Sequence, residues 1–127
     1  MKVFYEVKTN KSLNQVLIDL KKNLQLNSFG VLFELNFKDK IKEKGFYLEP
    51  NFIMLEVCNP KIASEILKEN IEIGYILPCK VVVYEKNNDH YLGILKPTSL
   101  IELIDDSFVE IADEIEKVLM NVVNESA

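Results

Sequence analysis

The sequence predicts an α+β domain: one five-stranded sheet, two long helices on one face of that sheet, and short helical inserts. Three observations lead to this fold class. Apolar and polar residues alternate in several short segments, as in half-buried strands. Two longer segments instead repeat apolar residues every three or four positions behind a capping signal, as in amphipathic helices. No Gly-rich or Pro-rich linker divides the 127 residues, which is the length of one ordinary domain, so we expect a single domain over residues 1–127.

The amino-terminal part carries the first alternation and the first long helix. Residues 2–8 alternate and end at a Thr-Asn pair, which predicts a strand followed by a turn. Ser12, with Gln15 three residues later, forms a capping box, and the leucine and valine residues behind it predict a helix over residues 13–25. Residues 29–35 then predict a second strand.

The middle of the chain carries shorter elements. Residues 36–45 are typical of a short polar helix that a glycine ends. Residues 51–57 predict a third strand. Asn59 then provides a cap, and Pro60 opens a helix that reaches about residue 68.

The last part predicts a connection, a hairpin and the second long helix. Residues 70–78 are apolar without a clear period, and we expect them to be buried. Residues 80–85 and 91–95 predict two strands joined by an Asn-Asn-Asp turn. Ser107 and Glu110 form a second capping box ahead of the closing helix. The predicted order is therefore β-α-β-α-β-α-β-β-α.

The composition of the uncovered sheet face is informative, because two long helices cover only one face of a five-stranded sheet. Alternate positions assign these apolar residues to the helix-covered face: Val3, Tyr5, Val7, Val31, Phe33, Leu35, Ile53, Leu55 and Val57. They assign a mixed set to the opposite face: Phe4, Glu6, Leu32, Glu34, Phe52, Met54, Glu56, Val82 and Tyr84. This second face is too apolar to stay fully in water, which predicts self-association or a bound ligand.

Charge and hydropathy argue against several classes of partner. The net charge of -5 and the pI near 4.9 oppose binding to phosphate backbones, and the densest basic run, Lys38 to Lys44, is interleaved with acidic residues. No segment approaches the roughly 18 apolar residues of a membrane-spanning helix, and the alternating amino terminus is not typical of a signal peptide. We therefore expect a cytoplasmic protein with neither a nucleic-acid nor a membrane partner. The four glycines are also too far apart for a phosphate-binding loop.

The two cysteines lie in two compact phrases, each where a predicted strand meets a turn. A Cys-Asn-Pro phrase starts at Cys58 ahead of a helix, and a Leu-Pro-Cys phrase ends at Cys79 ahead of a valine-rich strand. These phrases and their spacing resemble the domain-of-unknown-function family 302, and the resemblance covers nearly the whole chain. It implies a fold similar to the TATA-binding-protein-like α+β class, with an antiparallel sheet and helices on one side. It also implies a homodimer, and it implies no activity.

The candidate site is the sheet edge at the two cysteines. If the third and fourth strands are antiparallel neighbours, as the resemblance implies, Cys58 and Cys79 lie at the same edge and face each other. Asn59 and Glu56 are further candidates for ligand binding there. The helix that opens behind Cys58 presents unpaired N–H groups that favour a thiolate. We predict no metal site, because two thiolates are too few for structural zinc and the only histidine, His90, lies at the far end of the hairpin.

The residues leave three interpretations of the thiols open. They form a redox or sulfur-transfer pair, with Cys58 as the nucleophile and Cys79 as the resolving thiol. Alternatively, they hold a soft metal, a persulfide or a haem iron. The third interpretation is that both are small core residues, since free cysteine is among the most buried residue types. The sequence therefore leaves the cofactor unknown.

These observations favour a binding module over an enzyme. We expect a dimeric domain that uses its second sheet face for the partner chain and the Cys58/Cys79 edge for a small-molecule ligand. A thiol redox or sulfur-handling protein and a purely structural or interaction subunit are the alternatives. We expect His90 to be a solvated hairpin residue, and Glu114 and Glu116 to lie on a wet helix face, so none of these three is a catalytic candidate.

Overall fold

In the computed structural model, which describes residues 2–127, five strands form one antiparallel sheet in the order β1-β5-β4-β3-β2. The strands are β1 (Phe4–Thr9), β2 (Gly30–Asn36), β3 (Phe52–Cys58), β4 (Cys79–Lys86) and β5 (Asp89–Leu95). The α-helices are α1 (Leu13–Leu26), α2 (Phe37–Glu43), α3 (Pro60–Glu69), α4 (Pro97–Ile101) and α5 (Val109–Ser126). Two short 3-10 helices are η1 (Ile71–Ile76) and η2 (Asp106–Phe108). The predicted α+β class and the antiparallel sheet are confirmed.

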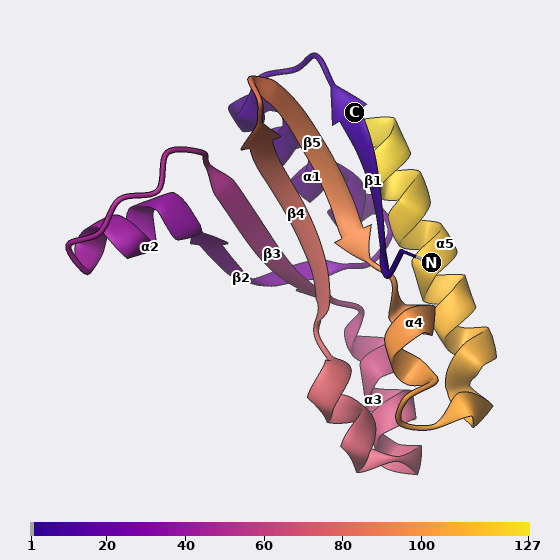
Figure 1. Ribbon diagram of the computed structural model, residues 1–127. Coiled ribbons are helices and arrows are strands. Elements are labelled where there is room, and N and C mark those ends of the chain that lie inside the picture. Colours follow the sequence, from indigo (N-terminus) through magenta and orange to yellow (C-terminus); the bar gives the residue numbers. More distant parts are fainter. Residues whose placement is uncertain (1) are drawn as a thin grey trace.

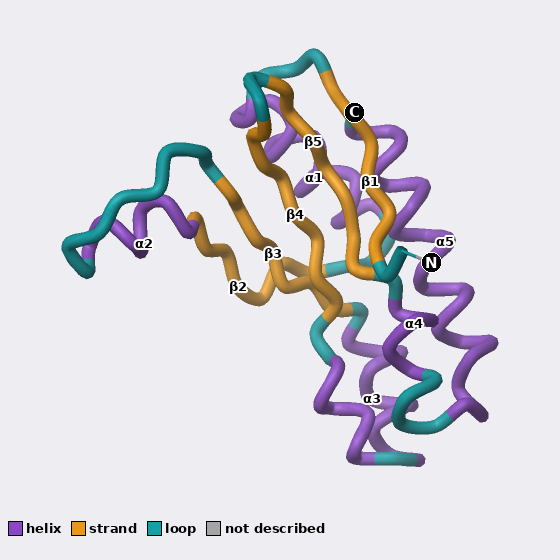
Figure 2. The backbone as a smooth tube through the Cα atoms, in the orientation of Figure 1, coloured by secondary structure: helices purple, strands orange, loops and turns teal. Residues whose placement is uncertain are grey.

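The two long helices, α1 and α5, lie on one face of the sheet, as predicted (Figure 1). The tube view shows α3 and α4 gathered at one end of the sheet, whereas α2 stands apart beside β2 (Figure 2). We call the sheet face away from α1 and α5 the open face. Within residues 2–127, no helix combines the length and the apolar character needed to cross a membrane.

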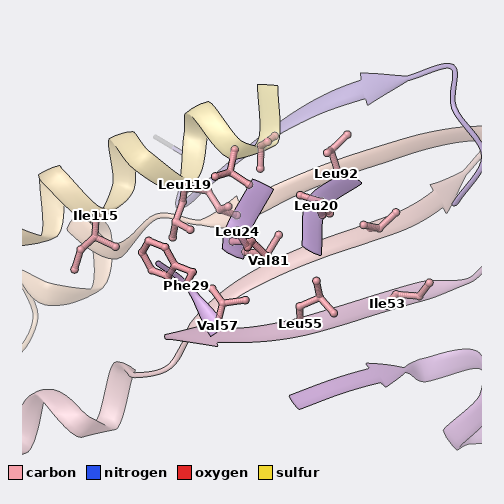
Figure 3. Packing of buried hydrophobic residues seen from close by; sticks show 14 of the residues in the cluster. Leu20, Leu24, Phe29, Ile53, Leu55, Val57, Val81, Leu92, Ile115 and Leu119 are labelled. Carbon is pink, nitrogen blue, oxygen red and sulfur yellow. The ribbon is translucent and has the colours of Figure 1, made fainter. Parts of the chain in front are cut away.

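The core lies between the sheet and the two long helices. Side chains of β3, β4 and β5 point towards Leu20 and Leu24 of α1 and towards Leu119 of α5 (Figure 3). All three leucines are fully buried, as are Leu55 and Leu92 on the facing strands. The first predicted capping box is confirmed in part, because the Ser12 side chain accepts a hydrogen bond from the backbone N–H of Gln15 at 3.2 Å.

The predicted faces are wrong for most of β2. A β-bulge between Val31 and Phe33 adds one residue to this strand. Beyond the bulge, Phe33 lies opposite Glu56 and Glu34 lies opposite Leu55. Because side chains alternate between the faces, a one-residue insertion moves every later side chain to the other face.

The bulge therefore exchanges the two sides of the strand. Phe33 and Leu35, which alternation assigns to the core, lie on the open face. Glu34 lies on the helix side instead, where its carboxylate is 2.6 Å from the ammonium group of Lys21 on α1. Glu34 and Glu56 therefore lie on opposite faces of the sheet.

The hairpin has the predicted strands and a tighter turn. Asp89 belongs to β5, so that only Asn87 and Asn88 connect β4 to β5. Both asparagines have positive φ, 52° and 67°, as a type I′ turn requires. His90 is half-buried, with its Nδ1 2.8 Å from the Lys11 carbonyl oxygen, so the expectation of a solvated histidine is wrong.

The connection before β4 is less buried than predicted. Residues 71–76 form η1, which buries Ile73 completely but leaves Ile71 and Tyr75 in solvent. The asparagine at position 70 caps this short helix by accepting from the Glu72 N–H. A single 3-10 helix can direct only part of its surface inwards, so the apolar composition of the segment overstates its burial.

Helix α4 is absent from the predicted order, and it explains why Glu116 is buried. The Glu116 carboxylate accepts hydrogen bonds from the Thr98 hydroxyl at 2.7 Å and from the Thr98 N–H at 3.2 Å. These donors belong to the first turn of α4, which packs against α5 and covers this side chain. The expectation that Glu116 lies on a wet helix face is therefore wrong.

The second capping box is also wrong in detail, although the closing helix is confirmed. Ser107 lies within η2 and does not cap α5. Asp105 caps η2 instead, because its carboxylate accepts from the Ser107 N–H at 3.0 Å and from the Ser107 hydroxyl at 2.6 Å. The Ser107 hydroxyl thus donates to Asp105 instead of accepting from the Glu110 N–H, as a capping box would require.

Candidate functional site

The structure brings the two cysteines to neighbouring strands, but it does not bring the thiols face to face. Cys79 lies opposite Val57 in the β3–β4 pair, while Cys58, one residue later on β3, lies opposite Gly30 of β2. Successive residues of a strand point to opposite faces, so this one-residue offset separates the two side chains. The expectation that they face each other is wrong, and both thiols are free.

Burial makes both thiols weaker acids than an ordinary cysteine. It raises the pKa of Cys79 from 9.0 to about 11, with charge repulsion from Cys58 as a second, smaller cause. It also raises the pKa of Cys58, by a smaller effect. Both residues are therefore protonated near neutral pH, which is the unreactive form of a thiol.

Of the two other candidates, one lies with the cysteines and one does not. Asn59 lines a small apolar hollow of about 20 Å³ together with both cysteines. Its side chain already accepts from the Ile62 N–H at 3.3 Å, so it caps α3 as predicted. Glu56 lies outside this hollow and opposite Lys80 on β4. Over residues 2–127, no three His, Cys, Asp or Glu side chains gather as a metal site requires.

The open face carries an aromatic row, in which Phe52 and Tyr84 lie on the predicted face and Phe37 and Tyr91 were not predicted. Phe37 of α2 packs edge-on against Phe52 of β3, with ring centroids 5.8 Å apart. Phe52 stacks on Tyr84 of β4 at 5.2 Å, and Tyr84 stacks on Tyr91 of β5 at 5.4 Å. The hairpin register could have revealed the last pair, because a two-residue turn places Tyr84 directly opposite Tyr91.

Beside this row, the open face is hollowed over β1, β5 and β4. The hollow has a volume of about 260 Å³ and is lined mainly by apolar atoms. At one end the Tyr84 hydroxyl donates a hydrogen bond of 2.5 Å to the Glu6 carboxylate. Burial, then this hydrogen bond and the Glu6 charge, raise the pKa of Tyr84, so its hydroxyl stays protonated.

A second apolar surface lies on what we call the β2–α2 arm, residues 30–47. The arm extends from the side of the sheet, and α2 buries none of its own residues (Figure 1). Six large apolar side chains of the arm are exposed: Val31, Leu32, Phe33, Phe37, Phe46 and Tyr47. Tyr47 is 78% exposed and Phe46 is 73% exposed.

Fold and surfaces together define an α+β domain of one five-stranded antiparallel sheet with an apolar open face. Residues 5–126 match the family described as "Domain of unknown function DUF302". A solved structure, an uncharacterized conserved DUF302 protein from Bacillus stearothermophilus, is similar at 36% sequence identity and a TM-score of 0.95, with 100% of each chain covered. No curated protein matches the chain. The chain belongs to the DUF302 family.

Proposed function

We propose that this chain is a dimeric binding module rather than an enzyme, in which the β2–α2 arm of one copy contacts a second copy. The observation that carries the proposal is the exposed apolar surface of the arm. At roughly 200 Å² for a full large side chain, its six exposed residues present on the order of 600 Å² in total, shared between the two sides of β2. The largest apolar patch of a typical monomer spans about 300–600 Å², and a stable interface buries about 800 Å² per partner.

The free edge of β2 supports the same partner. Edge strands that stay single in water carry lysine, proline, a β-bulge, an inward-pointing charge or a covering element. The other edge strand, β1, carries Glu6 and Lys8, and its Tyr5 hydroxyl donates to the Asn124 side chain of α5 at 2.6 Å. The β2 sequence, GVLFELN, has neither lysine nor proline, and its bulge and its inward-pointing Glu34 leave the backbone edge beyond the bulge uncovered. A second copy presents the same free edge and the same apolar side chains, which makes a two-fold contact self-complementary.

The first prediction concerns the mass in solution. We expect light scattering on a sizing column to give twice the 14.7 kDa chain mass, and the double variant Phe46→Ser/Tyr47→Ser to give the single-chain mass. The matched control is Tyr75→Ser/Leu103→Ser, because both of these side chains are also exposed, at 88% and 81%, and lie outside the arm. This control should remain a dimer. A wild-type chain that is monomeric at every concentration would contradict the proposal.

A small ligand at the Cys58/Cys79 edge is the second candidate function. What supports it is that both cysteines line one hollow with Asn59. A hollow of about 20 Å³ holds roughly one water-sized group, so this edge fits a single added atom, such as a persulfide sulfur, better than an organic molecule. The raised pKa values of both thiols weigh against the redox alternative with Cys58 as nucleophile.

Thiol titration tests this second candidate. With a chromogenic thiol reagent at neutral pH, we expect Cys58 to react more slowly than a free cysteine, and Cys79 to react only on unfolding. Because the folded pKa of Cys79 exceeds its unfolded value of 9.0, its burial stabilises the fold below pH 9, and this contribution is lost as pH rises towards 11. Cys58→Ser should remove the native reactivity. A rapid reaction of either thiol near pH 7 would restore the redox alternative.

A further inference from the structure

The hollow on the open face exists because no side chain can fill it. Gly93 lies at its floor, opposite Glu6 of β1 on one side and opposite Val82 of β4 on the other. Strand β1 approaches so closely that a Cβ atom on Gly93 would be 2.4 Å from the Tyr5 carbonyl oxygen. The close approach thus leaves an unfilled position in the middle of an otherwise apolar sheet surface.

The missing side chain lets two polar groups meet across β5. Glu6 reaches over Gly93 from β1, and its Oε1 accepts from the Tyr84 hydroxyl of β4. The second carboxylate oxygen, Oε2, makes no hydrogen bond to any residue in the range 2–127. One end of the hollow therefore offers a charged acceptor beside a neutral hydroxyl oxygen, which is a site for a hydrogen-bond donor.

Lys80 supplies a positive charge at the opposite end. It lies two residues before Val82 on β4 and is exposed, and it forms no ion pair with any residue that the structure describes. Glu6 and Lys80 are two strands and two residues apart, which places their Cα atoms at roughly 12 Å by strand spacing and rise. Both side chains are long enough to lean over the apolar floor between them.

The geometry points to a ligand of one chemical class: a small aromatic carboxylic acid whose ring carries a hydroxyl or amino group at the far end. Its carboxylate pairs with Lys80, its ring lies over Gly93 and Val82, and its hydroxyl or amino group donates to Glu6. The rings of Phe4 and Phe52 line the same hollow and favour an aromatic body. A volume of 260 Å³ is slightly below the roughly 300 Å³ at which drug-sized pockets begin, which limits the ligand to about one ring.

The probe for this site is para-hydroxyphenylacetate, which has the required acid, ring and hydroxyl. Titrated into the 15N-labelled full chain, it should shift the amide signals of Val82, Gly93 and Leu95. Phenylacetate lacks the ring hydroxyl and should bind about tenfold more weakly, because it cannot donate a hydrogen bond to the Glu6 carboxylate. Para-hydroxyphenylethanol lacks the carboxylate and should bind with about fivefold lower affinity, the effect expected from the loss of a partly exposed ion pair.

Variants separate recognition from simple charge attraction. Lys80→Met should weaken binding of the probe about fivefold, whereas Lys86→Met, on the same strand and face but outside the hollow, should leave it unchanged. Glu6→Gln should remove the preference for the hydroxylated probe over phenylacetate. Lys80 is exposed and Glu6 is half-buried, and the dispersed amide spectrum of each variant reports that it is folded.

A monomeric variant distinguishes a failure of the ligand proposal from a failure of the dimer proposal. The Phe46→Ser/Tyr47→Ser chain should still bind the probe, because the arm contributes no residue to the hollow. The proposal is overturned if no amide near Gly93 shifts with the probe. It is equally overturned if Lys80→Met and Lys86→Met weaken binding alike, or if the three probes bind with equal affinity.

Discussion

Gly93→Ala is expected to destabilise the folded chain by about 3 kcal/mol, the upper end of the usual cost of overpacking. The added methyl group would lie 2.4 Å from the Tyr5 carbonyl oxygen and 2.9 Å from the Glu6 Cβ. Two of the nearest atoms, this oxygen and the Glu6 Cα, belong to the backbone, which cannot rotate away as a flexible side chain does. Strand β1 must therefore move, and its hydrogen bonds to β5 are weakened.

Urea unfolding followed by circular dichroism measures this effect, as a lower transition midpoint. Gly74→Ala is the matched control, because a Cβ there would meet only the Leu67 side chain at 3.6 Å, an ordinary contact. This control should change the free energy of unfolding by less than about 0.5 kcal/mol. If both alanine variants unfold at the wild-type midpoint, β1 adapts without cost, and the hollow is not fixed by the backbone.

Leu55→Ala is expected to have the largest effect of all, a loss of about 3–5 kcal/mol in the free energy of unfolding. Leu55 lies in the middle of β3, is fully buried, and belongs to the cluster between the sheet and the helices α1 and α5. Removing three heavy atoms there leaves a cavity that rigid neighbours on both layers cannot close. The measurement is again the unfolding midpoint, under conditions where the chain is monomeric.

Leu103→Ala is the control for this substitution, since the same side chain at position 103 is 81% exposed. It should stay within about 0.5 kcal/mol of the wild type. A loss below about 1 kcal/mol for Leu55→Ala would mean that the central strand is not close-packed, and would contradict the described core.

The elements that could be predicted are those whose signals are local. The helix behind Ser12 and the hairpin at Asn87 each combine a periodic pattern with a cap or turn residue that acts within four residues. Helix α4 carries a proline at its start but has only five residues, so no apolar period can develop. Its stability comes from packing on α5 and from Glu116, which lies 18 residues from Thr98.

The candidate site was less predictable, because its geometry depends on pairing between distant strands. The edge at Cys58 and Cys79 could be located from two short phrases, but the one-residue offset between the thiols is a property of strand register. The hollow over Gly93 was missed for a related reason. Glu6 and Tyr84 are 78 residues apart in the sequence, and only the sheet order places β5 between them.

The bulge in β2 has a consequence for comparing members of this family. Because Leu32 is the unpaired residue, the pairing of Phe33 with Glu56 and of Glu34 with Leu55 does not depend on it. A relative lacking the residue at position 32 would have a regular strand in place of the bulge and would still present Phe33 on the open face. A relative that keeps this residue but pairs it regularly with β3 would present Glu34 outwards, so an alignment without a gap at this point can hide the inversion of a whole molecular surface.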